Sequence, residues 1–247
     1  MKNLFAISAL FLAAAACAAE EGLIFARTLR GDAEIKTPAQ TLKSGDTAAA
    51  SGAEISAKNG FASFALSNFS SCLLFSGKIK IEKFEQGAAQ SARAENFSEK
   101  SASELLISAG EAVAVFARGE PRPASKFKIS TKFGSFEPKG DNIKIEIGKN
   151  EARVSACDAA INYCKPGSQA AEYVPIDCEL VFREENGEIK TLRRQLGIKE
   201  KTALKEAVSA ASDAFKTSEF YRDENGKTRA RRIALKEFFT RMPKTKQ

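Results

Sequence analysis

The chain has 247 residues, with 38 Lys+Arg against 31 Asp+Glu and a formal net charge of +7. Hydrophobic residues make up 43% and charged residues 28%, a balance typical of a globular protein rather than a disordered one. The absence of histidine excludes Ser-His-Asp and Cys-His catalysis, histidine metal sites and imidazole pH switches. Neither the G-x-x-x-x-G-K-[ST] nor the G-x-G-x-x-G phosphate loop occurs. We therefore expect no catalytic, metal or cofactor site.

The first residues have the layout of a secretory signal peptide. Lys2 precedes an apolar run of thirteen residues from Leu4 to Ala16, and small residues follow. This run is shorter than the roughly 20 residues that a membrane-spanning helix needs. We expect residues 1–18 to be removed and the mature chain to be exported, periplasmic or secreted, with no transmembrane helix. A buried N-terminal helix is the alternative.

Cys17 adds a second possibility for the N-terminus. It follows the apolar run directly and resembles the acylated cysteine of bacterial lipoproteins, but Ala14 stands where that motif has Leu. Lipid attachment at Cys17 and cleavage after Ala18 both stay open.

The other four cysteines remain in the mature chain by either route. An even number of cysteines in an exported chain favours disulfides. The grouping of Cys157, Cys164 and Cys178 predicts one local bridge, with Cys72 as the fourth cysteine. Zinc is disfavoured because the spacings miss those of zinc sites, and solitary buried thiols are the remaining alternative.

Residues 22–182 have the pattern of consecutive strands. Apolar and polar residues alternate in Lys78–Phe84, Lys126–Ser130 and Asn142–Ile147, and turn signals such as Gly45-Asp46 and Asn59-Gly60 lie between runs. Period-two alternation is typical of antiparallel strands with one buried face. We predict a mainly β domain here, an antiparallel sandwich or a solenoid-like fold.

The pattern changes near the C-terminus. Asn186-Gly187 between two apolar runs predicts a hairpin, within a hairpin and linker region at residues 183–197. Residues 198–247 then predict a tail of two amphipathic helices divided by a turn at 223–226. The helical spacing is carried by Leu204, Ala207, Val208, Ala211 and Phe215, and later by Leu235, Phe238, Phe239 and Met242.

The basic excess of the chain lies in this last quarter. Residues 183–247 hold 17 Lys+Arg and 10 Asp+Glu, which accounts for the whole net charge of +7. Its densest part includes Arg229, Arg231, Arg232 and Lys236. These residues form either a solvated helix face or a contact with an anionic surface, such as lipid headgroups or wall polymer. Nucleic acid is disfavoured because export separates it from the chain and no aromatic readout motif accompanies the charge.

Several motifs in the β region point to a family. Leu42-Lys43-Ser44-Gly45-Asp46 is followed by Gly52-Ala53-Glu54-Ile55 and by an alternating strand that starts at Asn59-Gly60. This order resembles the FecR-type domain, named for the periplasmic part of the iron-dicitrate signalling regulator. Residues 127–134 and 139–145 resemble a later segment of the same family, so the resemblance covers about residues 22–150.

The resemblance implies an exported all-β binding or scaffolding module. The regulators themselves carry a cytoplasmic anti-sigma segment and a transmembrane helix, which this sequence lacks, so signalling to a sigma factor is not implied. We predict a non-enzymatic interaction module of the bacterial envelope that binds a protein or cell-wall polymer.

Two other functions stay open. One is a carbohydrate-active or wall-modifying enzyme that uses carboxylates alone, because the members of such a pair can lie far apart in sequence. The other is a structural lipoprotein tethered at Cys17.

Overall fold

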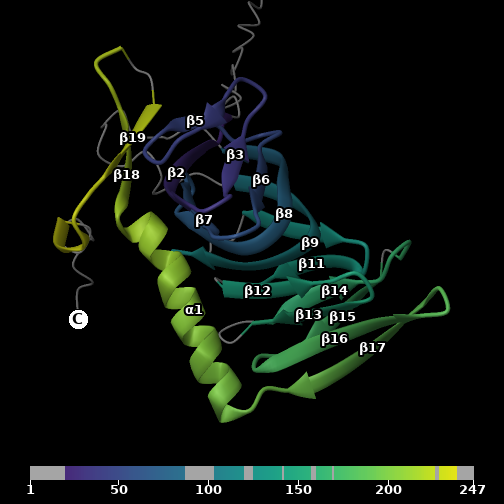
Figure 1. The fold of residues 1–247 in the computed structure, drawn as a ribbon. Coiled ribbons are helices and arrows are strands. Elements are labelled where there is room, and N and C mark those ends of the chain that lie inside the picture. Colours follow the sequence, from purple (N-terminus) through teal and green to yellow (C-terminus); the bar gives the residue numbers. More distant parts are fainter. Residues whose placement is uncertain are drawn as a thin grey trace, which may run out of the picture.

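The computed structural model describes residues 20–86, 103–119, 125–140, 142–156, 160–168, 170–225 and 228–237. The signal peptide, Cys17, Cys157 and the predicted helical positions Phe238, Phe239 and Met242 lie outside the described residues. The described chain is mainly β, as the alternation predicts (Figure 1).

The strands fall into two sets along the chain. The first set is β1 (Glu20–Glu21), β2 (Leu23–Arg30), β3 (Glu34–Lys36), β4 (Thr41–Leu42), β5 (Thr47–Ala49), β6 (Glu54–Ala57), β7 (Phe61–Leu66) and β8 (Ser70–Gln86). The second is β9 (Ser103–Arg118), β10 (Lys126–Thr131), β11 (Gly134–Pro138), β12 (Asn142–Ile147), β13 (Glu151–Ser155), β14 (Ile161–Cys164), β15 (Ala171–Val174), β16 (Cys178–Glu185) and β17 (Glu188–Gln195). The helix α1 (Ile198–Lys216) and the strands β18 (Ser218–Arg222) and β19 (Thr228–Arg232) follow.

The first seventeen strands form one continuous, largely antiparallel sheet. Its long central pair, β8 and β9, runs from Ser70 opposite Arg118 to Gln86 opposite Ser103. Strands β2, β3, β6 and β7 extend the sheet on the β8 side, and β12, β13, β16 and β17 extend it on the β9 side. Among the described strands, only β9 and β10 pair in parallel. The β8–β9 pair therefore joins the two halves of the molecule.

The main core lies between the folded-over parts of this sheet. Alternate residues of the predicted strands point into it, as Ile143, Ile145 and Ile147 of β12 show by being buried. Aromatic side chains fill the second half of the core, where Phe136 stacks on Tyr163 with ring centroids 5.4 Å apart and meets Phe182 edge-on. Burying each such side chain contributes about 1.5–3 kcal/mol.

A bulge bends the central pair. Gly77 of β8 is opposite Ala112 and Ile79 is opposite Ala109, so two residues of β9 face Lys78 alone. Gly77 has φ +87°, and a Cβ there would lie 1.8 Å from the carbonyl oxygen of Glu111. Only glycine fits this close approach of two backbones.

The helix α1 covers the outer face of β7, β8 and β9 (Figure 1). Phe215, Ala211 and Ala214 pack on the sheet in a second hydrophobic cluster, and the Ser71 hydroxyl donates to the carbonyl of Ala211 at 2.7 Å. The helical spacing predicted from Leu204 to Phe215 is confirmed. No helix within the described residues is long and apolar enough to cross a membrane.

Helical segments lie on both sides of the turn predicted at residues 223–226, because α1 precedes it and residues 235–237 follow it, as the pattern predicts. The helical spacing did not indicate the two short strands β18 and β19, which pair with each other on either side of this turn. Cross-strand neighbours explain why β18 and β19 pair. Glu219 lies opposite Arg231, and Phe220 lies opposite Ala230. Cross-strand pairs of opposite charge stabilise a hairpin, and an acidic turn followed by a basic run supplies them.

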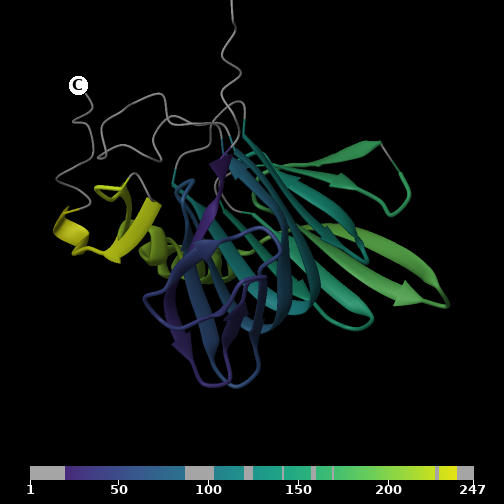
Figure 2. The ribbon, with the colours of Figure 1, turned by 90° about the horizontal axis from the view of Figure 1, so that it is seen from above.

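The predicted hairpin at Asn186-Gly187 is confirmed. Both residues have positive φ, 54° and 81°, as a type I′ turn requires. Strands β16 and β17 pair from Cys178 opposite Gln195 to Glu185 opposite Glu188. This hairpin extends away from the body on the side opposite β18 and β19 (Figures 1 and 2).

Candidate functional site

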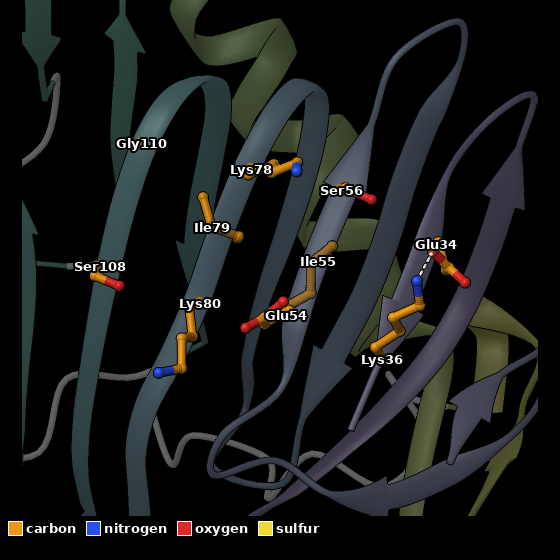
Figure 3. A pocket seen from close by; sticks show the side chains of 10 residues that line it. All are labelled: Glu34, Lys36, Glu54, Ile55, Ser56, Lys78, Ile79, Lys80, Ser108 and Gly110. Atoms are coloured by element: carbon orange, nitrogen blue, oxygen red, sulfur yellow. Dashed lines mark ion pairs between the residues drawn. The ribbon is translucent and has the colours of Figure 1, made fainter. Parts of the chain in front are cut away.

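A hollow of about 340 Å³ lies on the face of the sheet formed by β3, β6, β8 and β9. Its volume is near the lower end of the range for small-molecule sites, about 300–1,000 Å³. Figure 3 shows the side chains of four neighbouring strands that surround it. Its lining residues are Glu34, Lys36, Glu54, Ile55, Ser56, Lys78, Ile79, Lys80, Ser108 and Gly110.

Strand register explains why these residues meet. Ile35, Ile55 and Ile79 are opposite one another and buried, so the residues on either side of them point outward. One outward row places Glu34, Ser56 and Lys78 on adjacent strands, and the next places Lys36, Glu54, Lys80 and Ser108. The hollow forms because Ser56, Ser108 and Gly110 are small and stand among long charged side chains.

Ion pairs hold several of these charges in place. Lys36 lies 2.9 Å from Glu34, and Lys80 lies 2.9 Å from Glu82. The hydrogen bond from each lysine to its glutamate raises the pKa of that lysine, and Glu54 adds to both shifts by its charge. The hydroxyl of Ser108 donates to Glu82 at 2.6 Å, and this bond is the main cause that lowers the pKa of Glu82.

Two groups of the hollow have no ion pair within the described part of the chain. These are the ammonium of Lys78 and the carboxylate of Glu54, which are diagonal neighbours on β8 and β6. Diagonal neighbours of this kind lie roughly 7–8 Å apart, within reach of long side chains. A ligand in the hollow can therefore meet a cation, an anion and two hydroxyls at once.

Hydrogen bonds shift the pKa of four carboxyl groups in the described part of the chain. Glu82, Glu104, Glu185 and Glu200 have a lowered pKa, in each case first because of a hydrogen bond from a hydroxyl, ammonium or guanidinium group. A carboxylic acid that protonates a glycosidic oxygen needs the opposite shift. Within the described residues, no cluster of three or more Cys, Asp or Glu could hold a metal ion.

The structure places three residues of the predicted basic cluster, Arg229, Arg231 and Arg232, on the strand β19. Arg229 pairs with Asp223 at 3.1 Å, and Arg231 pairs with Glu219 at 2.5 Å. Arg232 donates to the carbonyl of Arg27, and Lys236 lies in the exposed helical turn beyond β19. Arg229 and Arg231 thus have carboxylate partners within the chain. Contact with an anionic surface stays a prediction.

The described cysteines are free thiols. Cys72 is buried in the main core, while Cys164 and Cys178 are half-buried. Burial raises the pKa of the Cys72 thiol well above its usual value. Because Cys157 lies outside the described residues, the bridge within its cluster stays a prediction.

Sequence reasoning missed the hollow. The alternation of Lys78 and Lys80 indicates an outward face, but the hollow also needs Glu34 and Glu54 from two other strands. Their adjacency depends on the pairing of β3, β6 and β8, for which no local pattern gives a signal.

Comparison with known proteins adds a partial likeness. No protein-family model and no curated protein matches the chain. Two crystal structures of a candidate anti-sigma factor from Parabacteroides distasonis, at 2.50 Å and 1.65 Å resolution, superpose with a TM-score of 0.41 at 14% identity. The likeness covers 61% of this chain and 62% and 63% of those chains, less than two thirds of their length. A likeness of this extent does not assign the chain to a family.

Proposed function

We propose that this chain is an exported, FecR-like interaction module of the bacterial envelope that binds cell-wall polymer in the hollow. The observation that carries the proposal is that Lys78 and Glu54 line the same hollow beside two hydroxyls. Neither charge has an ion pair within the described part of the chain. The leader-like N-terminus and the FecR-like motifs support the location. The positive φ values of Gly45 and Gly52, 103° and 79°, support the turn conformations that the motifs imply.

The chemistry of the wall polymer suits this lining. Its peptide parts carry carboxylates and ammonium groups, and its sugars carry hydroxyls. A carboxylate of the polymer would pair with Lys78, and an ammonium or hydroxyl would bind Glu54. Charge-assisted hydrogen bonds of this kind contribute about 1.5–3 kcal/mol each.

Titration of the exported full chain with soluble muropeptides tests the proposal. Calorimetry should show that Lys78→Glu weakens binding about tenfold or more, the factor that corresponds to about 1.4 kcal/mol. Lys205→Glu makes the same charge change on the exposed face of α1 and should leave the affinity within about threefold. Equal losses in both variants, or no binding of muropeptides by the unaltered chain, would reject the hollow as the site.

Filling the hollow provides a second test. A Cβ at Gly110 would approach nothing closer than the carbonyl oxygen of Lys78, at 3.8 Å. Gly110→Leu should therefore keep the fold, block the hollow and abolish muropeptide binding. Binding that survives this substitution in a folded variant would contradict the proposal.

Export is tested separately by the intact mass of the mature protein from an expressing bacterium. A diacylglycerol-modified N-terminus at Cys17 would indicate a membrane-anchored lipoprotein, and a mass that matches cleavage near Ala18 would indicate a periplasmic or secreted chain. An uncleaved N-terminus would overturn the envelope location.

A further inference from the structure

The strand β17 is an open edge of the sheet. It pairs along all of its eight residues with β16, and no other described strand pairs with its far side. Every residue of β17 except Ile189 and Arg194 is exposed. Such an edge presents a row of backbone N–H and C=O groups to which another strand can add.

Three devices that usually protect an edge, namely shortness, proline and a bulge, are missing from β17. The strand is long, contains no proline, and its pairing with β16 has no register shift. Lys190 is the edge charge most suited to blocking, but it is held 2.5 Å from Glu185 on the neighbouring strand. The hairpin also extends beyond the body of the molecule (Figure 2).

We propose that β17 accepts an added strand from a partner protein, and that this strand alternates acidic and apolar residues. Backbone hydrogen bonds would supply the affinity, and the side chains of β17 would supply the specificity, as in other cases of strand addition. This surface is separate from the hollow, which lies on β3, β6, β8 and β9.

The side chains of β17 define the chemistry of the partner. Arg193 has no carboxylate partner among the described residues, whereas Lys190 and Arg194 are paired with Glu185 and Glu179. Leu192, next to Arg193, points to the opposite face and is 62% exposed. An added strand with an acidic residue beside Arg193 and an apolar residue beside Leu192 would pair the cation and cover the apolar side chain. Acidic and apolar residues then alternate along the partner, because successive side chains point to opposite faces of a strand.

A second copy of the chain fits less well. Each copy carries a net charge of +7, so two copies repel each other. An antiparallel pair centred on Thr191 would also place Ile189, rather than a carboxylate, beside Arg193. The unpaired cation of the edge therefore favours an acidic partner over self-association.

Amide hydrogen exchange on the full chain tests the proposal with two capped peptides. One peptide alternates Val and Glu, and the other alternates Val and Lys. We expect the Val/Glu peptide to slow exchange of residues 188–195 about tenfold or more, and the Val/Lys peptide to leave it unchanged. Arg193→Glu should reverse this preference. Arg183→Glu, with the same charge change on the exposed part of β16, should leave it as it is.

Each alternative result has a defined meaning. No protection by either peptide, or equal protection by both, would overturn the proposal. If exchange of residues 188–195 slows as the protein concentration rises without any peptide, the partner of β17 is a second copy of the chain and not an acidic strand. Muropeptide binding by the Arg193→Glu variant is measured alongside, so failure at β17 and failure at the hollow can be told apart.

Discussion

The bulge at Gly77 allows a sharp test of the fold by a single methyl group. Gly77→Ala places a Cβ on a residue with φ +87°, 1.8 Å from the carbonyl oxygen of Glu111 and 2.6 Å from the Cα of Ala112. Both atoms belong to the backbone of the long strand β9, so neither can turn aside as a side chain would. The substitution therefore strains the pair of strands that joins the two halves.

The expected loss in the free energy of unfolding of Gly77→Ala has two parts. A left-handed conformation costs a residue with a Cβ roughly 1–2 kcal/mol, and forcing a methyl group into a packed site costs about 1–3 kcal/mol. The free energy of unfolding should fall by about 2–5 kcal/mol, since the two costs add. In a chain of this size each kcal/mol lowers the Tm by roughly 2–4 °C.

Gly110→Ala in the same bulge is the matched control. The φ of Gly110 lies outside the left-handed region, so a side chain there causes no backbone strain. An added Cβ would contact only the carbonyl oxygen of Lys78, at an ordinary 3.8 Å. Gly110→Ala should change the free energy of unfolding by no more than about 1 kcal/mol in either direction. Urea unfolding followed by circular dichroism measures both variants. If Gly77→Ala is no more destabilising than Gly110→Ala, the account of the bulge is wrong.

Three further predictions concern the helix, its N-terminus and the thiols. Phe215→Ala should lower the free energy of unfolding by about 3–5 kcal/mol and speed hydrogen exchange in α1, because the ring is buried against the sheet; unchanged exchange would contradict this packing. Hydrogen bonds from Arg194 and from the helix N-terminus lower the pKa of Glu200 to about 2. The stability difference between the unaltered chain and Glu200→Gln should therefore be complete above pH 4.5 and disappear as the pH falls towards 2; urea unfolding across this range would show a pH-independent difference if the pairing is absent. In the native protein, alkylation of Cys72 should be much slower than that of Cys164, and equal rates measured by mass spectrometry would contradict its burial.

Local patterns in the sequence predict much of this fold correctly. The alternation in Lys78–Phe84 and Asn142–Ile147 predicts strands, since a residue type repeated every second position gives one apolar face whichever strand lies beside it. Asn186-Gly187 predicts a hairpin because positive φ at two successive residues is a property of the turn itself. The helical spacing from Leu204 to Phe215 predicts α1 for the same local reason.

Other elements depend on contacts between distant residues. Phe69 adopts φ 59°, which is unfavourable for a bulky side chain, and its ring packs in the cluster beneath α1. The strands β18 and β19 had no signal in the helical spacing, because they depend on cross-strand pairs such as Glu219 with Arg231.

The sequence by itself determined the strand-rich class, the main turns and the helix, because each depends on spacing within one short segment. Only the tertiary structure decided which strands became neighbours. That choice brings Glu54 and Lys78 to one hollow, leaves Arg193 on an open edge and pairs Arg229 with Asp223. The physical reason is that charges on separate strands interact only after the buried isoleucines have fixed the register of the sheet.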